Sequence, residues 1–211
     1  MPVLHSALLD SAGFRHGFPT RDTPEDALLQ ALGAPRIVQA RQVHGARAVL
    51  AVEAAGQEAD ALVARAGQGE ACVGVRVADC VPVLVASRAT GDVVAIHAGW
   101  RGVVAGVVRA GVELLGGADR VAAIGPCIGP CCFEVGRDVG ARVGFVARDA
   151  GDKAFVDLRA AVRAHLAALG VDEVDDVLGC TKHEARFHSF RRDGADSGRM
   201  LASIAARPTR V

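Results

Sequence analysis

The chain has 211 residues, of which 24 are basic and 24 acidic, so its formal net charge is zero. Non-specific binding to nucleic acid depends on a net basic surface that releases counterions, so we exclude this class of function. Apolar residues make up 51% of the chain, which is enough for a full core, and we expect one domain over residues 1–211.

The sequence favours a soluble cytoplasmic protein. Residues 1–10 have no basic start and no long apolar run, so no signal peptide is expected. No stretch approaches the roughly 18–20 unbroken apolar residues that span a bilayer. Three of the six cysteines crowd into Cys127, Cys131 and Cys132. This spacing argues against a disulfide framework and favours reduced thiols, one of them bound to a metal ion.

The first half of the chain predicts one short helix followed by strands. Thr23 is expected to be the N-cap of the helix and Pro24 to lie in its first turn, with an apolar face at residues 27, 28, 31 and 32. Short runs rich in β-branched residues predict strands at 48–52, 71–77, 81–86 and 93–96. The last run is typical of a fully buried strand, which places His97 at the C-terminal end of a rigid element.

The second half predicts two helices among further strands. Apolar residues at helical spacing run from 104 to 115, and Gly116-Gly117 ends them. A strand at 121–124 enters a loop with a doubled Gly-Pro-Cys motif. Asp157 is the expected N-cap of a helix that ends at Gly170, and a last strand is expected at 199–205. Because helices and strands mix without strict alternation, an α+β fold is favoured over a doubly wound parallel sheet.

Three short segments each carry one side chain that can bind a soft metal ion, namely His44, Cys80 and His97. Zinc uses two imidazoles and one thiolate when it keeps a fourth position open for water or substrate. All three residues are expected at element ends beside a small residue or a turn. Their spacing matches no compact zinc signature, and an isolated Cys or His is more often a packing or hydrogen-bonding residue.

The same residues also allow a site without metal. Cys80 could be a nucleophile with His97 as its base, since a thiol needs a nearby imidazole or positive charge to ionise. A Cys–His pair does not need a second imidazole, so His44 favours the metal interpretation. A structural zinc in a non-enzymatic protein would need a closed site with four ligands, and only three good ligands stand out.

Seven motifs of the chain occur in the order found in a known family: RQVHG at 41–45, DALV at 60–63, ADCVPV at 78–83, HAGWRG at 97–102, IGPCIGPCCFEVG at 124–136, DLRAAV at 157–162 and SFRRDGADSGRM at 189–200. They resemble the family variously called laccase-domain proteins, multicopper polyphenol oxidases and peptidoglycan editing factors. The resemblance begins near residue 36 and continues to the last strand. HAGWRG followed by the doubled Gly-Pro-Cys loop is highly specific.

This resemblance implies a four-layer α/β/β/α fold with mixed sheets, usually monomeric, and zinc bound by His44, Cys80 and His97. It also implies a purine nucleoside enzyme that phosphorolyses adenosine, guanosine, inosine and methylthioadenosine and deaminates adenosine to inosine. The expected partners are a purine nucleoside and phosphate, with no nucleic acid or membrane. Family members usually have a longer segment before RQVHG; residues 17–36 are short and contain no Asn, so substrate choice could differ.

Two other activities are weighed against this one. A multicopper oxidase holds several copper ions with many histidines, often in His-x-His pairs, whereas this chain has seven His and no such pair. A blue-copper site would also need a weak axial ligand. Polyphenol oxidation is therefore disfavoured, although copper could bind to the same three ligands. The remaining alternative is a metal-free amidohydrolase that uses Cys80 and His97 on peptidoglycan precursors.

Deamination requires a group that moves a proton to the leaving ammonia. Zinc would activate the water that attacks the purine C6, and known zinc deaminases use a Glu in a His-x-Glu motif that is missing here. Asp79 is the first candidate for this role and Glu134 the second. An alternative role for Asp79 is to hold a turn or to orient a zinc-bound His.

Phosphorolysis requires a group that binds phosphate, and Arg suits this through permanent charge and bidentate contacts. Arg41, Arg101 and Arg191 are the candidates because each lies within or beside a motif, and Arg41 is preferred. If RQVHG is extended, Gln42 and His44 share one face, so Gln42 could also face the pocket. The remaining notable side chains are interpreted as structural or surface residues: Cys72, Trp100, the loop Cys127–Cys132, Cys180, His183 and His188.

Overall fold

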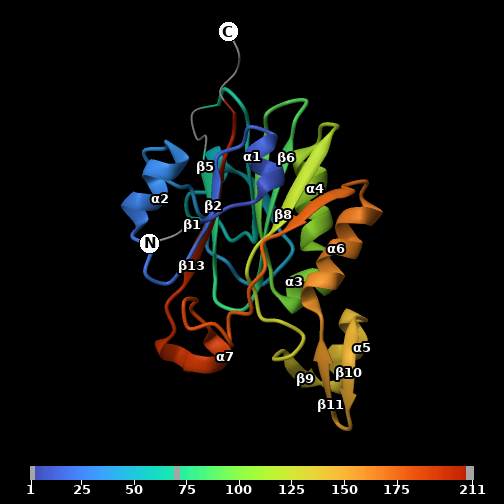
Figure 1. Cartoon of the computed structure of the whole chain (residues 1–211). Coiled ribbons are helices and arrows are strands. Elements are labelled where there is room, and N and C mark those ends of the chain that lie inside the picture. Colours follow the sequence, from blue (N-terminus) through green and yellow to red (C-terminus); the bar gives the residue numbers. More distant parts are fainter. Residues whose placement is uncertain (1–2, 69–71, 208–211) are drawn as a thin grey trace.

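A computed structural model describes residues 3–68 and 72–207 of the chain. Within these residues, a six-stranded and a four-stranded sheet pack face to face, and helices cover the outer face of each (Figure 1). This α/β/β/α order of layers confirms the fold that was expected from the sequence.

The six-stranded sheet is mixed and has the order β12-β8-β6-β7-β4-β3. Its outer pairs, β12 with β8 and β4 with β3, are parallel, and the inner pairs are antiparallel. The inner strands β6 and β7 are buried along their whole length, because helices cover one face and the second sheet covers the other. The strands are β3 (Ala48–Leu50), β4 (Ala61–Ala64), β6 (Val81–Ser87), β7 (Val93–Ala98), β8 (Arg120–Ile124) and β12 (Glu173–Asp176).

The four-stranded sheet has the order β1-β2-β13-β5 and is antiparallel throughout. Apolar side chains from both sheets, including Leu62, Val75 and Leu84, form the core between them. Because side chains alternate along a strand, the other set of residues on β6 and β7 faces the outer helices. The strands are β1 (Val3–Leu4), β2 (His16–Pro19), β5 (Cys72–Val77) and β13 (Met200–Ala205).

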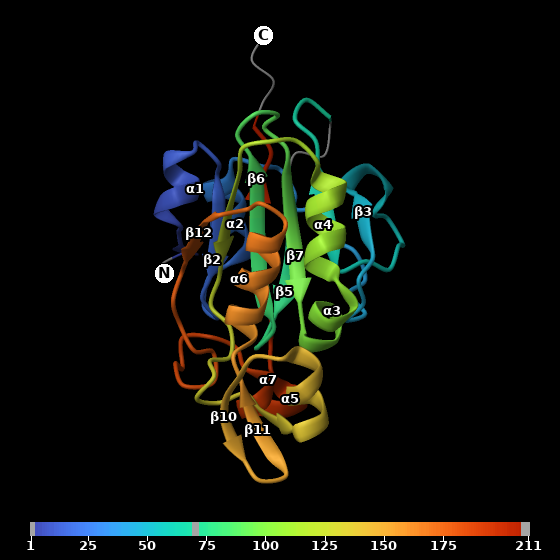
Figure 2. The ribbon, with the colours of Figure 1, turned by 90° about the vertical axis from the view of Figure 1, so that its right-hand side faces the viewer.

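Helices α3 (Trp100–Ala105), α4 (Val107–Leu115) and α6 (Leu158–Ala168) cover the outer face of the six-stranded sheet (Figure 2). Helix α2 (Glu25–Leu32) covers the four-stranded sheet, where its apolar side chains pack with those of β5 and β13. The short helix α1 (Ala7–Ser11) lies beside β8 and β12.

A smaller unit extends beyond one end of the two main sheets (Figure 1). It consists of a three-stranded antiparallel sheet with the order β10-β11-β9, together with α5 (Arg137–Val143). Helix α7 (Phe190–Asp193) lies at the same end and is followed by a 3-10 turn at Gly194–Asp196. Elsewhere in the fold, a 3-10 turn at Ala51–Glu53 follows β3. This unit was not predicted from the sequence; its strands are β9 (Glu134–Gly136), β10 (Val146–Ala150) and β11 (Lys153–Val156).

Several predicted elements have different ends in the structure. The helix expected from 104 to 115 is two helices, because Gly106 adopts a left-handed conformation with φ 92°. Pro24, not Thr23, is the N-cap of α2, since the Thr23 hydroxyl accepts a bond from the Thr20 amide instead. The predicted Asp157 cap is confirmed, with its carboxylate accepting a bond from the Ala160 amide at 2.9 Å. The predicted strand at 71–77 begins at residue 72, and position 71 lies outside the described residues.

Two further expectations concern the whole described chain. None of its described helices combines the length and the apolar composition needed to cross a bilayer. Its six cysteines are free thiols, as the crowding of three of them in one loop indicated.

Candidate metal centre

The three predicted metal ligands lie together in the fold. His44, Cys80 and His97 each offer one ligand atom, and these atoms lie within 4.8 Å of one another. The two imidazole rings meet edge to face with their centroids 4.7 Å apart. The structure therefore brings side chains from three distant sequence motifs to one point.

Strand pairing explains why these residues meet. Strands β6 and β7 are antiparallel, and Val81 at the start of β6 pairs with Ala98 at the end of β7. Cys80 and His97 therefore flank the same end of one strand pair. His44 comes from the loop before β3 and has a φ of 59°, a left-handed conformation that is uncommon outside glycine.

The carboxylate of Asp60 holds two of the three ligands in place. It is fully buried, and its Oδ1 lies 2.7 Å from Nδ1 of His97. The same carboxylate accepts hydrogen bonds from the backbone amides of Val43, His44 and Gly45 at 2.7–3.2 Å. Asp60 thus stabilises the unusual backbone of the His44 loop. It also favours the His97 tautomer in which Nδ1 carries the proton and Nε2 is free to bind a metal ion.

The absence of a side chain at Gly99 leaves space for the ligands. A Cβ atom there would lie 3.0 Å from Cδ2 of His44 and 3.1 Å from Sγ of Cys80. Both distances are shorter than ordinary van der Waals contact, so any larger residue would push the two ligands apart. The Gly of the HAGWRG motif is therefore part of the geometry of the centre.

The charges of the centre are coupled through hydrogen bonds. Burial opposes ionisation of Cys80, but hydrogen bonds with His44 and His97 outweigh it and lower the pKa of the thiol to about 7. Burial also disfavours the charged imidazole, yet Asp60 and Cys80 raise the pKa of His97 to about 9. Burial also opposes the negative charge of Asp60. The hydrogen bonds from His97 and from the backbone amides nevertheless keep the pKa of Asp60 below its usual value. Without a metal ion the centre therefore favours a Cys80 thiolate beside a protonated His97; the thiolate is the form that binds metal ions, and His97 must release its Nε2 proton to bind as well.

The donor set fits a zinc ion. Zinc binds Cys sulfur at about 2.3 Å and His nitrogen at about 2.0 Å in tetrahedral geometry, so its ligand atoms lie about 3.3–3.8 Å apart. The three observed ligand atoms, all within 4.8 Å of one another, can surround such an ion with small side-chain movements. Three protein ligands leave a fourth position, which is the arrangement of catalytic zinc sites.

These ligands line a cavity of about 620 Å³ at the end of the sheets where β5 and β7 end and β13 begins. The volume suits a small organic molecule. The walls combine apolar side chains with three arginines, two amides and one carboxylate, besides the three candidate ligands. The residues that line the cavity are Gln39, Ala40, Gln42, His44, Arg76, Ala78, Asp79, Cys80, His97, Ile128, Phe133, Phe190, Arg191 and Arg199.

The predicted proton carrier Asp79 lines this cavity beside Cys80. Its φ of 88° is left-handed, and its carboxylate accepts two short hydrogen bonds that hold it there. One comes from the Thr181 hydroxyl and the other from the Arg191 amide, both at 2.6 Å. The second candidate, Glu134, is exposed and is not part of the cavity lining.

The three predicted phosphate-binding arginines have different positions. Arg191 lines the cavity. Arg41, the preferred candidate, lies outside the lining and forms an ion pair with Glu58 on the surface. Arg101 also lies outside it and stacks on the ring of Trp100. Proximity to a motif in the sequence therefore did not distinguish the arginine that lines the cavity from the other two, because it does not determine the direction of a side chain.

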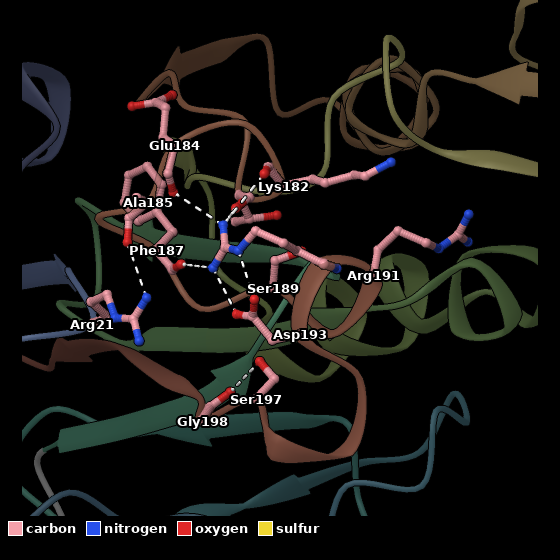
Figure 3. A network of polar contacts seen from close by, with 12 residues as sticks. Arg21, Lys182, Glu184, Ala185, Phe187, Ser189, Arg191, Asp193, Ser197 and Gly198 are labelled. Carbon is pink, nitrogen blue, oxygen red and sulfur yellow. Dashed lines mark hydrogen bonds and ion pairs between the residues drawn. The ribbon is translucent and has the colours of Figure 1, made fainter.

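A second arginine fixes the segment that carries Arg191. The Arg192 guanidinium donates to the carbonyls of Thr181 and Phe187 at 2.9 and 2.8 Å and to the carboxylate of Asp193 at 2.7 Å. Figure 3 shows this network and shows the Arg191 side chain pointing away from it. The Arg191 guanidinium in turn donates to the backbone carbonyl of Glu134 at 2.6 Å.

Gln42 and His44 both line the cavity, although RQVHG is not extended as the expectation assumed, because His44 has a left-handed φ of 59°. The amide of Gln42, however, pairs with the backbone of Arg76, donating to its carbonyl at 2.8 Å and accepting from its amide at 2.7 Å. Gln42 therefore positions Arg76, which sequence reasoning did not single out as a cavity residue.

Other site residues were also missed from the sequence. Asp60 begins the DALV motif, and an acidic residue directly before a buried strand could have been recognised as a buried charge that needs partners. Arg199, Phe133 and Phe190 line the cavity, yet no local pattern distinguishes them from other arginines and phenylalanines.

Comparison with known proteins assigns the chain to a family. Residues 22–207 match the family model described as multi-copper polyphenol oxidoreductase laccase. The chain is 41% identical over 150 residues to the Shigella flexneri protein named purine nucleoside phosphorylase YfiH, an alignment that covers 64% of this chain and 59% of that protein. It is also 41% identical over 169 residues to adenosine deaminase RL5 from an unknown prokaryotic organism, covering 72% of this chain and 64% of that protein.

A solved structure supports the same assignment. The crystal structure of Neisseria meningitidis protein NMB0706 superposes with a TM-score of 0.77 at 32% identity, covering 92% of this chain and 91% of that chain. The fold and the sequence together define a mixed α/β protein with a candidate His–Cys–His metal centre. The chain belongs to the multi-copper polyphenol oxidoreductase laccase family, and it spans less than two thirds of the length of the two named relatives.

Proposed function

We propose that this protein is a zinc-dependent purine nucleoside enzyme that catalyses phosphorolysis of adenosine, guanosine, inosine and methylthioadenosine and deamination of adenosine to inosine. One structural observation carries the proposal: His44, Cys80 and His97 converge on the wall of a cavity large enough for a nucleoside. The names of the two relatives give the substrate class. We further propose that it acts as a monomer in the cytoplasm.

The three ligand residues would hold the zinc ion, which when bound supplies a Lewis acid that can activate a water molecule for attack. Asp60 keeps His97 in the required tautomer through the 2.7 Å bond to Nδ1. In deamination, we assign to Asp79 the transfer of a proton from the attacking water to the leaving ammonia. Its carboxylate is fixed at the cavity wall by Thr181 and Arg191, so it does not need to be ordered when substrate binds.

In phosphorolysis, a phosphate oxygen bonds to C1′ of the ribose while the bond from C1′ to the purine breaks. The base then leaves as a neutral purine, because the proton given up by the attacking hydrogen phosphate passes to a ring nitrogen of the base. Phosphate carries negative charge, and three arginines line the cavity: Arg76, Arg191 and Arg199. Arg191 is the preferred contact because its backbone is anchored at Asp79, next to the ligand Cys80. The purine would pack against Phe133 and Ile128, which are buried at the cavity wall.

Product analysis with and without a metal chelator tests this proposal. Purified protein is incubated with adenosine and phosphate, and the products are separated by chromatography. We expect adenine and inosine from the untreated protein, none from the chelated protein, and recovery when zinc is restored. A Cys80→Ser variant should bind less zinc and lose both activities. Absence of turnover from a zinc-loaded, folded protein would refute the proposal.

One observation favours a second function, a metal-free amidohydrolase acting on peptidoglycan precursors. The Cys80 thiol lies close to two imidazoles, and His97 is itself backed by Asp60, which is the order of groups in a Cys–His–Asp nucleophilic site. This enzyme would keep its activity in the presence of a chelator and lose it on alkylation of Cys80. The same chelation experiment, repeated with peptidoglycan precursors as substrates, therefore separates the two functions.

A further inference from the structure

A second group of metal-binding side chains lies outside the proposed active centre. Cys131, Cys132, Cys180 and His183 each offer one ligand atom, and all four atoms lie within 4.8 Å of one another. The neighbouring distances are 3.4 Å from Sγ of Cys131 to Sγ of Cys132, 3.9 Å to Sγ of Cys180 and 3.8 Å to Nδ1 of His183. From the sequence these residues were interpreted as structural or surface residues.

These distances match the edges of a zinc tetrahedron. With zinc–sulfur bonds of about 2.3 Å and zinc–nitrogen bonds of about 2.0 Å, the expected separations are about 3.8 Å between sulfurs and about 3.6 Å between sulfur and nitrogen. Three thiols and one imidazole form one of the closed ligand sets that structural zinc uses. We propose that Cys131, Cys132, Cys180 and His183 form a second, structural zinc site.

Backbone hydrogen bonds hold this cluster together. The Gly129 amide donates to Sγ of Cys180 at 3.3 Å, a contact that stabilises a metal-bound thiolate. The Cys132 amide donates to the Gly129 carbonyl at 2.9 Å, and the His183 amide donates to the Cys180 carbonyl at 3.1 Å. Each of the two turns therefore presents its own pair of ligands to the other.

The site joins two segments that are far apart in the sequence and that both support the cavity. Cys127 and Cys180 pair as an isolated parallel bridge between these segments. One segment carries Ile128, whose amide donates to the Asp79 carbonyl at 2.9 Å, and the other carries Thr181, whose hydroxyl holds the Asp79 carboxylate. A zinc ion here would tie together the two segments that position Asp79. The zinc ion would influence the cavity only by fixing the position of these two segments.

Another cluster with potential ligands does not support a site. His5, Asp10 and His16 also lie close together. Both ring nitrogens of His16 are already used, since Nε2 accepts from the Ser6 amide at 2.7 Å and Nδ1 lies 2.9 Å from the Phe14 carbonyl. By contrast, the thiols of Cys131, Cys132 and Cys180 contact mainly one another. Cys131 and His183 are exposed to solvent, so a metal ion can reach them.

Metal stoichiometry tests the second site independently of the first. Reduced protein is stripped with a chelator, titrated with zinc and analysed for bound metal. We expect two zinc ions per chain for the wild type and one for the double variant Cys131→Ser/His183→Gln, whose substituted residues are both exposed. A matched control, Cys72→Ala, removes a buried thiol outside both clusters and should retain two. Cys80→Ser should retain one, because it affects only the proposed active centre.

Cobalt substitution adds a spectroscopic readout that does not depend on activity. Cobalt bound by three thiolates gives stronger sulfur-to-metal absorption than cobalt bound by one, so the Cys80→Ser variant should retain most of this absorption and the double variant should lose most of it. Equal zinc content in the wild type and the folded double variant would overturn the proposal. If the double variant does not fold, a wild-type cobalt spectrum without the absorption of three thiolates would overturn it, as would a disulfide between Cys131 and Cys180 in the freshly purified protein.

Discussion

Replacing Asp60 by Asn tests the role of the buried carboxylate with almost no change in shape. Oδ1 of Asp60 accepts hydrogen bonds from the His97 ring and the His44 amide, while Oδ2 accepts hydrogen bonds from the amides of Val43 and Gly45. An Asn side chain has one oxygen and one NH₂ group. Whichever way it is oriented, its NH₂ group therefore faces two donors that lose their acceptor.

The expected magnitude follows from these lost bonds. A buried donor without a partner costs about 1–3 kcal/mol, so the loss of two acceptors should lower the free energy of unfolding by about 2–6 kcal/mol. Residues that orient a metal ligand typically contribute 10- to 100-fold to metal affinity, which corresponds to about 1.4–2.8 kcal/mol of zinc binding free energy. Because zinc adds RT ln(1 + [Zn]/Kd) to the stability of the folded protein, unfolding of the metal-free protein and zinc affinity measure the two losses separately.

The assay combines zinc competition against a chromophoric chelator with urea unfolding of the metal-free protein. Asp92→Asn is the matched control, since Asp92 is also buried and accepts bonds from Arg65 and the Ala66 amide at 2.9 and 2.7 Å, but takes no part in the metal centre. It should lower stability and leave zinc affinity unchanged. If folded Asp60→Asn protein binds zinc at this centre as tightly as the wild type, the proposed function of Asp60 is wrong.

Three further predictions address the ligand geometry, phosphate binding and stability against acid. Gly99→Ala places a Cβ 3.0 and 3.1 Å from atoms of two ligands, so competition titration should show zinc affinity reduced by about tenfold or more while the protein stays folded; unchanged affinity would contradict this. Arg191→Ala should raise the KM for phosphate by about tenfold or more in steady-state assays, whereas Arg41→Ala, outside the cavity, should leave it unchanged; equal effects of both would refute the assignment. Burial lowers the pKa of His16, so the unfolded chain binds the proton more readily, and stability should fall as the pH drops below about 6.5. Urea unfolding between pH 7.5 and 5 should show a smaller decrease for His16→Gln, and identical slopes would contradict the prediction.

The sequence by itself was sufficient for the parts of the protein that depend on local pattern. Runs of β-branched residues predicted the strands around β5 to β8, and Asp157 predicted the start of α6, because strand propensity and helix capping act over a few residues. The three candidate metal ligands were also singled out from short motifs, and the structure brings them within 4.8 Å of one another. Gln42 was expected to face the cavity beside His44 if RQVHG were extended; both residues line the cavity, although the backbone at His44 is left-handed and not extended.

Only the tertiary structure decided which distant residues complete the site. Asp60 reaches the ligands because β4 pairs with β7, and this pairing cannot be deduced from either strand alone. The same limit applies to the arginines, since Arg41 was preferred from the sequence while Arg191, and not Arg41, lines the cavity. The cluster of Cys131, Cys132, Cys180 and His183 arises where two loops meet. Local sequence determines what each segment can form, whereas the packing of the sheets and loops determines which side chains come within bonding distance.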